Sequence, residues 1–168
     1  MLQLETAAAG HVALVRLERT DGEPLRRLFY RLSPETIYRR FLSPLARPEQ
    51  ARPERLLDLD HCDREALAAV VDGEIVGVAR WFRQPSQPAA EIAVVVTDAW
   101  QGQGVGTRML SSLAALARSA GIDRFTVTMQ ADNRGSIRLL RRFDSQARLV
   151  HSQGIYEATI SLNPEVEP

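Results

Sequence analysis

Lysine is absent from this chain of 168 residues, and all 21 of its basic residues are arginine. Without a lysine the protein cannot form a Schiff base through its own side chain, which excludes the usual pyridoxal-phosphate chemistry. A Walker A phosphate loop is also excluded, because that motif places a lysine against the β- and γ-phosphates. Two common classes of phosphate-binding enzyme are therefore ruled out by composition alone.

Cysteine is almost as scarce as lysine. Cys62 is the single cysteine, so the chain has no internal disulfide. His61, Cys62 and Asp63 are three adjacent potential metal ligands, but their spacing suits no common zinc site. The sequence therefore predicts no bound metal.

Net charge and long apolar runs are missing too. The 21 basic residues are balanced by 21 acidic ones, which argues against a nucleic-acid partner because such proteins normally carry a basic excess. The chain has no apolar run of roughly 18 residues, the length of a membrane span. Its first residues include an early glutamate and no basic segment, unlike a secretory signal peptide. We therefore expect a cytoplasmic protein, a monomer or homodimer, with no membrane partner.

The hydrophobic spacing predicts one α+β domain over residues 1–162, followed by a tail at residues 163–168. Period-two and continuous apolar runs predict strands at residues 11–18, 65–71, 75–82, 91–96, 125–129, 147–151 and 155–162. Helical spacing predicts helices at residues 22–32, 105–120 and 134–143, another that begins at Pro34, and a short one at residues 54–59 within a loop.

Three glycines, Gly102, Gly104 and Gly106, lie between the apolar strand 91–96 and the helix 105–120. A helix N-terminus has unpaired N–H groups and a partial positive charge, and glycines allow a phosphate to approach the backbone closely. The spacing does not fit the G-x-G-x-x-G motif of dinucleotide-binding proteins. The residues alone leave two readings, an anion site or a tight turn without a ligand.

The stretch Gln101-Gly102-Gln103-Gly104-Val105-Gly106 fits the Q/R-x-x-G-x-G/A motif, and with its flanking strand and helix it resembles the GNAT N-acetyltransferases. The resemblance covers about residues 11–162. Within the family, the segments SPETIYRRFLSP and AAEIAVVVTDAWQGQGVGTRML are most similar to the acetyltransferase domain of bacterial protein-lysine acetyltransferases. The resemblance to the GNAT family implies a single GNAT-type α+β domain with a bent, mixed and mostly antiparallel sheet that is flanked by helices. Its parallel central strands, 91–96 and 125–129, would splay apart around acetyl-CoA.

The resemblance also assigns roles to individual residues. Backbone amides of the glycine turn would hold the pyrophosphate of acetyl-CoA, the last strand residues would pair with the pantetheine arm, and an asparagine would contact that arm from the neighbouring strand. The cofactor-binding residues expected on this basis are Val94, Val95, Val96, Gln101, Gly102, Gln103, Gly104, Val105, Gly106, Thr107 and Asn133. Acetyl-CoA is the expected cosubstrate, and no metal is implied.

Amine acetylation requires removal of a proton. An alkylamine has a pKa near 10.4, so about one molecule in 2,500 is unprotonated at neutral pH, a handicap of roughly 4.6 kcal/mol. Glu91 is the predicted general base, because it is the only acid on the apolar strand that should face the thioester. We expect it to be partly buried, with a raised pKa. Asp98, Asp60 and His61 are alternatives.

The sequence departs from the family pattern after Asn133. Leu140 occupies the position where many members carry a tyrosine that protonates the leaving thiolate, and Asp144 replaces the usual glycine. Tyr156 is a possible substitute that the sequence does not place. Direct transfer in a ternary complex is favoured over an acyl-enzyme on Cys62, which has no histidine partner other than its neighbour.

The sequence therefore predicts an acetyl-CoA-dependent N-acetyltransferase whose acceptor is a primary amine. A lysine on a partner protein is favoured as the acceptor over a small polyamine-like or aminoglycoside-like amine. A non-catalytic acyl-CoA-binding module is the alternative that the missing tyrosine leaves open. The loop 84–88 and the charged segment 43–64, in which acids are slightly in excess, are expected to border the acceptor site.

Overall fold

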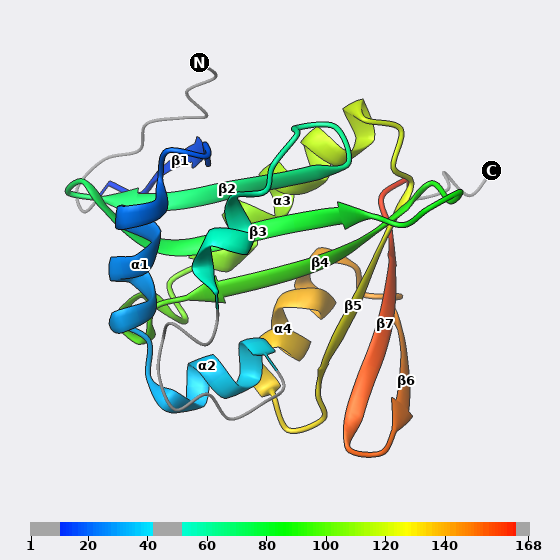
Figure 1. The fold of residues 1–168 in the computed structure, drawn as a ribbon. Helices are drawn as coiled ribbons and strands as arrows, with labels where there is room; N and C mark the ends of the chain where they lie inside the picture. The colour runs from blue at the N-terminus through cyan, green and yellow to red at the C-terminus, as the bar shows by residue number, and fades with distance from the viewer. Residues whose placement is uncertain (1–10, 42–51, 164–168) are drawn as a thin grey trace.

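The strands of the described residues form one seven-stranded sheet in the order β1-β2-β3-β4-β5-β7-β6. The computed structural model describes residues 11–41 and 52–163 (Figure 1). The strands are β1 (Ala13–Arg16), β2 (Arg64–Val71), β3 (Glu74–Arg83), β4 (Ala89–Val96), β5 (Arg124–Gln130), β6 (Arg148–Ser152) and β7 (Ile155–Ser161). Neighbouring strands are antiparallel except β4 and β5, which are parallel. This mixed sheet confirms the predicted fold class.

Helices lie on both faces of the sheet (Figure 1). They are α1 (Gly22–Tyr30), α2 (Pro34–Phe41), α3 (Val105–Ser119) and α4 (Arg134–Phe143), with short 3-10 helices η2 (Pro53–Leu57) and η3 (Asp98–Trp100). Apolar residues of α1 and α2 pack on one face, and those of α3 and α4 pack on the other. Among the described helices, none is long and apolar enough to cross a membrane.

Two apolar cores form because side chains alternate between the two faces of a strand. Met109 of α3 packs in one core with Trp81 and Phe125 of the sheet. Leu25 and Phe29 of α1 belong to the other core. All five side chains are at most 2% exposed, and full burial of such a side chain contributes about 1.5–3 kcal/mol. The helices are thereby fixed against a common sheet, which positions the ends of β4 and β5.

The two parallel strands diverge soon after they begin. Their register runs only from Ala89 opposite Arg124 to Glu91 opposite Thr126. After Glu91, β4 continues to Val96 without a strand partner on that edge, while β5 continues beside β7. This confirms the predicted splayed pair, and it leaves a fork in the middle of the sheet.

Two predicted elements were too long. The strand expected at residues 11–18 is confined to β1, because it pairs with β2 over those four positions only. The helix expected at residues 22–32 ends at Tyr30, and Ser33-Pro34 begins α2 almost at once. Ser33 caps α2, which begins at Pro34 as predicted, since its Oγ accepts a hydrogen bond from the N–H of Thr36 at 3.2 Å.

The charged segment 43–64 is described only in part, because residues 42–51 lie outside the described residues. The short helix predicted at residues 54–59 is present as the 3-10 helix η2. The domain limits of residues 1–162 stay a prediction, and all but the first residue of the expected tail lies outside the described residues.

Candidate active site

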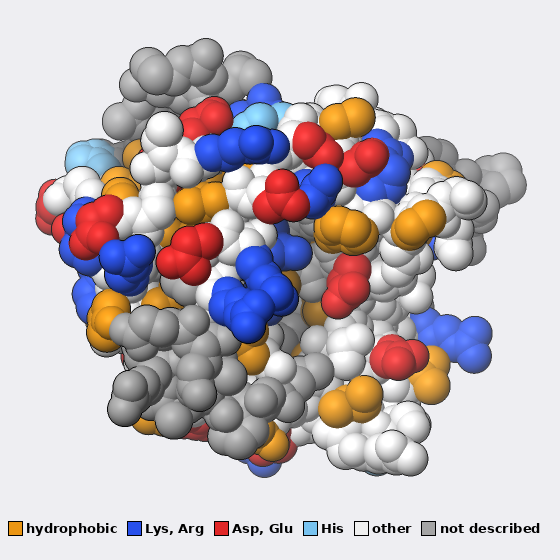
Figure 2. Space-filling view, in the orientation of Figure 1, with side chains coloured by type: hydrophobic (Ala, Val, Ile, Leu, Met, Phe, Trp, Pro, Cys, Tyr) orange, Lys and Arg blue, Asp and Glu red, His pale blue; other side chains and the backbone are white. Residues whose placement is uncertain are grey.

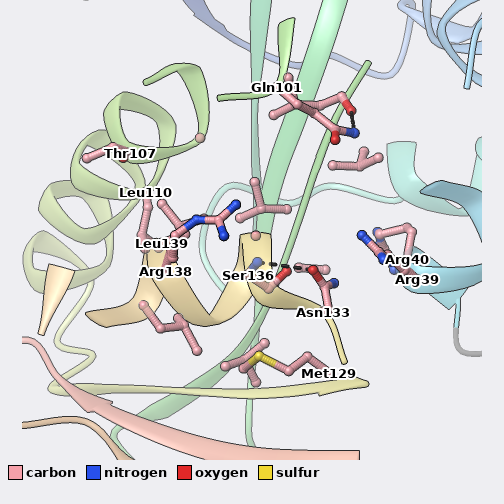
Figure 3. A pocket seen from close by; sticks show the side chains of 18 of the residues that line it. Arg39, Arg40, Gln101, Thr107, Leu110, Met129, Asn133, Ser136, Arg138 and Leu139 are labelled. Atoms are coloured by element: carbon pink, nitrogen blue, oxygen red, sulfur yellow. Dashed lines mark hydrogen bonds between the residues drawn. The ribbon is translucent and has the colours of Figure 1, made fainter. Parts of the chain in front are cut away.

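A cavity of about 490 Å³ occupies the fork between β4 and β5 (Figure 3). Its walls come from α2, β4, the glycine turn, α3, β5 and α4. Of the predicted cofactor-binding residues, the cavity is lined by Val94, Val95, Val96, Gln101, Gly102, Gly104, Gly106, Thr107 and Asn133. The structure thus brings most of the predicted set together around one space.

The glycine turn ends at an uncapped helix. Gly102 and Gly104 have φ angles of +73° and +82°, which favour glycine, whereas Gly106 has helical geometry. Gly104 is the N-cap of α3, where no side chain caps the helix and the first turn has no acidic residue. A Cβ on Gly106 would lie 3.4 Å from Cδ2 of Leu139, so that glycine permits close packing of α3 on α4. The first N–H groups of α3 are therefore free to bind an anion.

Arginines give this cavity a positive lining. Arg39 and Arg40 contribute from α2, and Arg138 and Arg142 contribute from α4. Figure 3 shows Arg39 and Arg40 on the opposite side of the cavity from Arg138. No aspartate or glutamate of the described chain lines the cavity. Such a lining suits a ligand with several phosphate oxygens.

Sequence reasoning did not select these four arginines. Arg138 and Arg142 both lie in the helix predicted at residues 134–143, where arginines also commonly face solvent. A signal was present in their spacing, because residues four apart project from the same helical face. Only the packing of α4 beside the glycine turn shows that this face borders a cavity.

Gln101 connects the glycine turn to α2. Its Nε2 donates to the backbone oxygen of Val96 at 3.0 Å and to Oγ1 of Thr36 at 3.1 Å. Oγ1 of Thr36 in turn donates to Oδ1 of Asp98 at 3.0 Å. Asp98 also accepts hydrogen bonds from the N–H and hydroxyl of Ser33. The N-terminus of α2 is therefore tied to the turn after β4.

These bonds give Asp98 a structural role. Burial alone would raise the pKa of Asp98, but hydrogen bonds from Ser33 and Thr36 outweigh it and hold the pKa below its ordinary value. A carboxylate that is ionised and occupied by three donors is a poor proton acceptor. The reserve assignment of Asp98 as the base has no support in this geometry.

Asn133 lies at the N-terminus of α4. Its Oδ1 accepts a hydrogen bond from the N–H of Ser136 at 3.1 Å, so it is the N-cap of that helix. The residue is 8% exposed and also lines the cavity. Its predicted contact with the pantetheine arm stays a prediction, to which the structure adds a capping role.

The side chains of two predicted cofactor-binding residues lie outside the cavity. Val105 is 3% exposed in the core under α3, and Gln103 donates from Nε2 to the backbone oxygen of Ala99 at 2.7 Å. Neither lines the cavity, because Val105 is buried in the core and the exposed side chain of Gln103 bonds back to the backbone before the turn. Contact through their backbone N–H groups stays a prediction.

Glu91 is exposed, so the prediction of partial burial was wrong. Glu91 occupies the last position of the β4–β5 register, on the face of the sheet that carries α2. The described helices on that face do not extend over Glu91. It does not line the cavity, although its neighbours Ile92 and Ala93 do. Opposite it on β5, Oγ1 of Thr126 accepts a hydrogen bond from Nε2 of Gln84 at 2.9 Å. The loop that begins at Gln84 therefore lies beside the fork, and its predicted place at the border of the acceptor site stays a prediction.

Glu91 lies within electrostatic range of two arginines. Burial lowers the pKa of Arg40 to about 10; Arg80 adds to the decrease and Glu91 opposes it. Burial also lowers the pKa of Arg80, again opposed by Glu91. The two cations and the carboxylate form a charged group at the end of the cavity where the strands divide.

No tyrosine is among the described residues that line the cavity. Leu140, which occupies the family's tyrosine position, is 3% exposed and forms part of the wall. Tyr156 lies opposite Met129 in the β5–β7 register, and its ring centroid is 5.2 Å from that of His151. The hydroxyl groups present in the lining belong to Thr36, Thr107, Thr128 and Ser136.

The remaining candidates lie at the start of β2, away from the cavity. Oδ1 of Asp60 accepts N–H hydrogen bonds from Cys62, Asp63 and Arg64, and the bond from Cys62 is the largest cause of a pKa lowered to about 2. His61 bonds through Nδ1 to Oε1 of Glu65 at 2.8 Å. None of these residues lines the cavity, and no described group of three side chains could hold a metal ion.

The acids of segment 43–64 are also distributed differently from the expectation. In the described part, Asp58 and Asp60 pair with Arg64, and Asp63 pairs with Arg83 at 2.7 Å. These carboxylates are thereby neutralised by neighbouring cations. The charges that do line the cavity are arginines, so the predicted acidic border is not formed by the described residues.

Comparison with known proteins now identifies the fold and its cavity. A sequence model of the acetyltransferase (GNAT) family matches residues 29–144. The chain belongs to the GNAT acetyltransferase family. This range holds the whole glycine turn, β4, β5 and α4, so the GNAT match includes every wall of the cavity described above.

Two curated GNAT relatives are bacterial enzymes. The chain is 32% identical over 128 residues to an acetyltransferase of Pseudomonas aeruginosa, covering 74% of this chain and 69% of that one. It is 30% identical over 129 residues to the acetyltransferase Pat of Mycolicibacterium smegmatis, covering 75% of this chain. The match spans only 37% of the length of Pat.

Solved GNAT structures share the architecture. The GNAT domain of PAT from S. lividans superimposes with a TM-score of 0.83 at 27% identity, covering 95% of this chain and 96% of that one. YncA of Salmonella typhimurium, solved with acetyl-CoA, gives a TM-score of 0.72 at 17% identity, covering 94% and 97% of the two chains. The second likeness supports the fold alone.

Proposed function

We propose that this GNAT protein transfers the acetyl group of acetyl-CoA directly to a primary amine in a ternary complex. The observation that carries the proposal is a single arginine-lined cavity that joins an uncapped helix N-terminus to the fork beside Glu91. Phosphates would bind at the first end, and the amine would react at the second. Acetyl-CoA supplies the activated thioester for this transfer.

The residues present fit acetyl-CoA. The N–H groups from Gly102 to Thr107 would donate hydrogen bonds to the pyrophosphate, with Arg138 and Arg142 beside it. The edge of β4 that faces the fork has no strand partner after Glu91. Its backbone groups could therefore bond the amide groups of a pantetheine arm, although the oxygen of Val96 already accepts a hydrogen bond from Gln101. The predicted roles of Val94, Val95 and Val96 are proposed on this basis.

Glu91 is proposed as the general base. Its carboxylate stands at the end of the cavity that the thioester would reach, and it is open to solvent. An exposed carboxylate can accept a proton from the bound ammonium through water, and the resulting neutral amine is then free to attack the thioester. The thiolate is a good leaving group, so transfer does not depend on the tyrosine that Leu140 replaces.

Two acceptor classes have support from relatives. Pat of Mycolicibacterium smegmatis and PAT of S. lividans resemble the chain, which agrees with the sequence-based preference for a lysine on a partner protein. An L-2,4-diaminobutyric acid acetyltransferase is 31% identical over 100 residues, which supports a small amine. The predicted cytoplasmic location and the monomeric or homodimeric state remain part of this proposal.

Acceptor-dependent release of CoA tests the proposed function. Purified protein is incubated with labelled acetyl-CoA in separate mixtures that each contain one kind of acceptor: amines, lysine peptides or a cell extract. We expect CoA release that requires an acceptor and is about 10²–10⁴-fold slower in Glu91→Gln near neutral pH. Acetyl-CoA that binds, with no acceptor-dependent release in any mixture, would make the protein an acyl-CoA-binding module instead.

A further inference from the structure

Arg40 of α2 and Arg80 of β3 form no hydrogen bond or ion pair with any described residue, although both are half-buried. The recorded contact of Arg40 is with the ring of Phe41, 4.8 Å from its guanidinium carbon. Arg83, three residues after Arg80 on β3, differs: it pairs with Asp63 and donates to the backbone oxygen of Ala120. A guanidinium removed from water is stabilised by a paired anion, and this pair has none within the described chain.

The two arginines converge on the acceptor side of the fork. Arg80 lies opposite Ala93 in the β3–β4 register, and Phe82 lies opposite Glu91. Because side chains two apart share a face of a strand, Arg80, Ala93 and Glu91 all project toward α2, which carries Arg40. Ala93 and Arg40 line the cavity, whereas Arg80 and Glu91 do not, although both lie within electrostatic range of Arg40.

The short side chain of Ala93 leaves room between these charged groups. Diagonal neighbours on adjacent strands are about 7–8 Å apart, within reach of long side chains, which is consistent with the mutual influence of Arg80, Arg40 and Glu91. Glu91 nonetheless forms no ion pair with either arginine. Figure 2 shows positive side chains gathered near the middle of this face, with acidic side chains around them.

A simple alkylammonium would meet two cations and one carboxylate in this space. The net repulsion disfavours an acceptor whose only charge is positive. An acceptor that carries its own carboxylate next to the amine would satisfy the arginines and present its nitrogen to Glu91. Arginine binds a carboxylate through two parallel N–H groups, which also fixes the orientation of the acceptor.

We propose that Arg40 and Arg80 bind a carboxylate of the acceptor, so that the preferred acceptor is a free amino acid acetylated on an amino group close to its carboxylate. This inference rests on the proposed acetyl transfer and specifies its substrate class. A lysine inside a protein is favoured less, because its neighbouring carboxyl group is consumed in a peptide bond.

Matched acceptors test this assignment. CoA release is measured for the standard amino acids and for diaminobutyrate, each against its carboxamide, with butylamine and lysine peptides alongside. We expect kcat/KM to be at least tenfold higher for the best amino acid than for its carboxamide, with most of the difference in KM. Arg80→Gln should remove this preference and leave stabilisation by acetyl-CoA unchanged, since Arg80 does not line the cavity.

Two further variants control the experiment. Arg80→Lys keeps the charge and should retain part of the preference, which a purely structural role would not predict. Arg26→Gln removes one positive charge from the exposed part of α1 and should behave as wild type. Equal rates with an amino acid and its carboxamide, or an unchanged preference in Arg80→Gln, would overturn the proposal. Selective transfer to lysine peptides, with or without adjacent glutamate, would overturn it as well.

A binding measurement separates this proposal from the proposed function. With CoA present, N-acetylglycine should raise the melting temperature more than N-acetylglycinamide, and Arg80→Gln should abolish the difference. If this difference in melting temperature is found but no amine is acetylated, the proposed carboxylate site is supported and the proposed acetyl transfer is wrong. If amines are acetylated and the difference is absent, the proposed carboxylate site is wrong.

Discussion

A valine at position 104 tests the cofactor site most directly. Gly104 has φ +82°, and a Cβ built there meets no atom within 4 Å. The added side chain therefore projects into the open space in front of the α3 N-terminus, where the pyrophosphate would lie. Gly104→Val should prevent acetyl-CoA from approaching the free N–H groups.

The same substitution also strains the backbone, so a matched control is needed. Gly154, in the turn between β6 and β7, has the same φ of +82° and likewise has no atom within 4 Å of a built Cβ. A left-handed conformation costs a residue with a Cβ about 1–2 kcal/mol. Gly104→Val and Gly154→Val should therefore lower the melting temperature by similar amounts, about 2–8 °C for a chain of this size.

Binding should distinguish the two variants. At a ligand concentration of about 100 times Kd, binding stabilises the native state by about 2.7 kcal/mol, which raises the melting temperature by about 5–11 °C. We expect this shift in wild type and in Gly154→Val, and no shift in Gly104→Val, by thermal denaturation with and without acetyl-CoA. A full shift in Gly104→Val would refute the placement of the pyrophosphate at this turn.

Three further predictions concern single side chains. Glu91→Gln should keep the acetyl-CoA shift but lower kcat by about 10²–10⁴-fold near neutral pH, with a smaller loss at high pH where free amine is abundant; an unchanged pH–rate profile would place the base elsewhere. Arg138→Gln should weaken acetyl-CoA binding by up to about fivefold, because the side chain is exposed. Calorimetry at two salt concentrations should show that this loss of affinity becomes smaller at high salt. Arg134→Gln, on the same helix but outside the cavity, should cause no loss of affinity. Asp98→Asn should destabilise the fold by at most about 1 kcal/mol at neutral pH. The folded pKa of Asp98 is depressed, so its contribution to the free energy of unfolding is present above the unfolded pKa of about 3.9 and is lost as pH falls through the folded value. Denaturant unfolding at several pH values measures this contribution as the difference in stability between wild type and Asp98→Asn. A difference that stays constant down to low pH would contradict the prediction.

The architecture was predictable because the apolar periods along the chain are strong. The continuous run from Glu91 to Val96 predicted a strand buried in the middle of the sheet, and the repeat from Val105 predicted a helix packed on it. The glycine spacing between them located the turn. These signals are local in sequence, so no knowledge of distant contacts was needed.

The charged part of the site depends on contacts between distant residues. Arg80 and Arg40 are far apart in the chain, and they come within electrostatic range of each other only because α2 packs against β4, the strand next to β3. Glu91 is exposed because the helices packed on its face of the sheet do not extend over it. The pattern of apolar residues in the strand does not predict where those helices end. Asp98 was considered as a base because its three hydrogen-bond donors from α2 could not be seen in the sequence.

The cavity has walls on both faces of the sheet: Arg39 and Arg40 come from the α2 side, and Leu110 and Arg138 come from the α3 and α4 side. The opening between β4 and β5 therefore runs through the full thickness of the sheet. In the proposed reaction, the two substrates would enter from opposite sides and meet in the middle, so neither would have to leave for the other to bind. Substitutions on the α2 face would then alter which amine is accepted without changing the residues proposed to bind CoA on the opposite face.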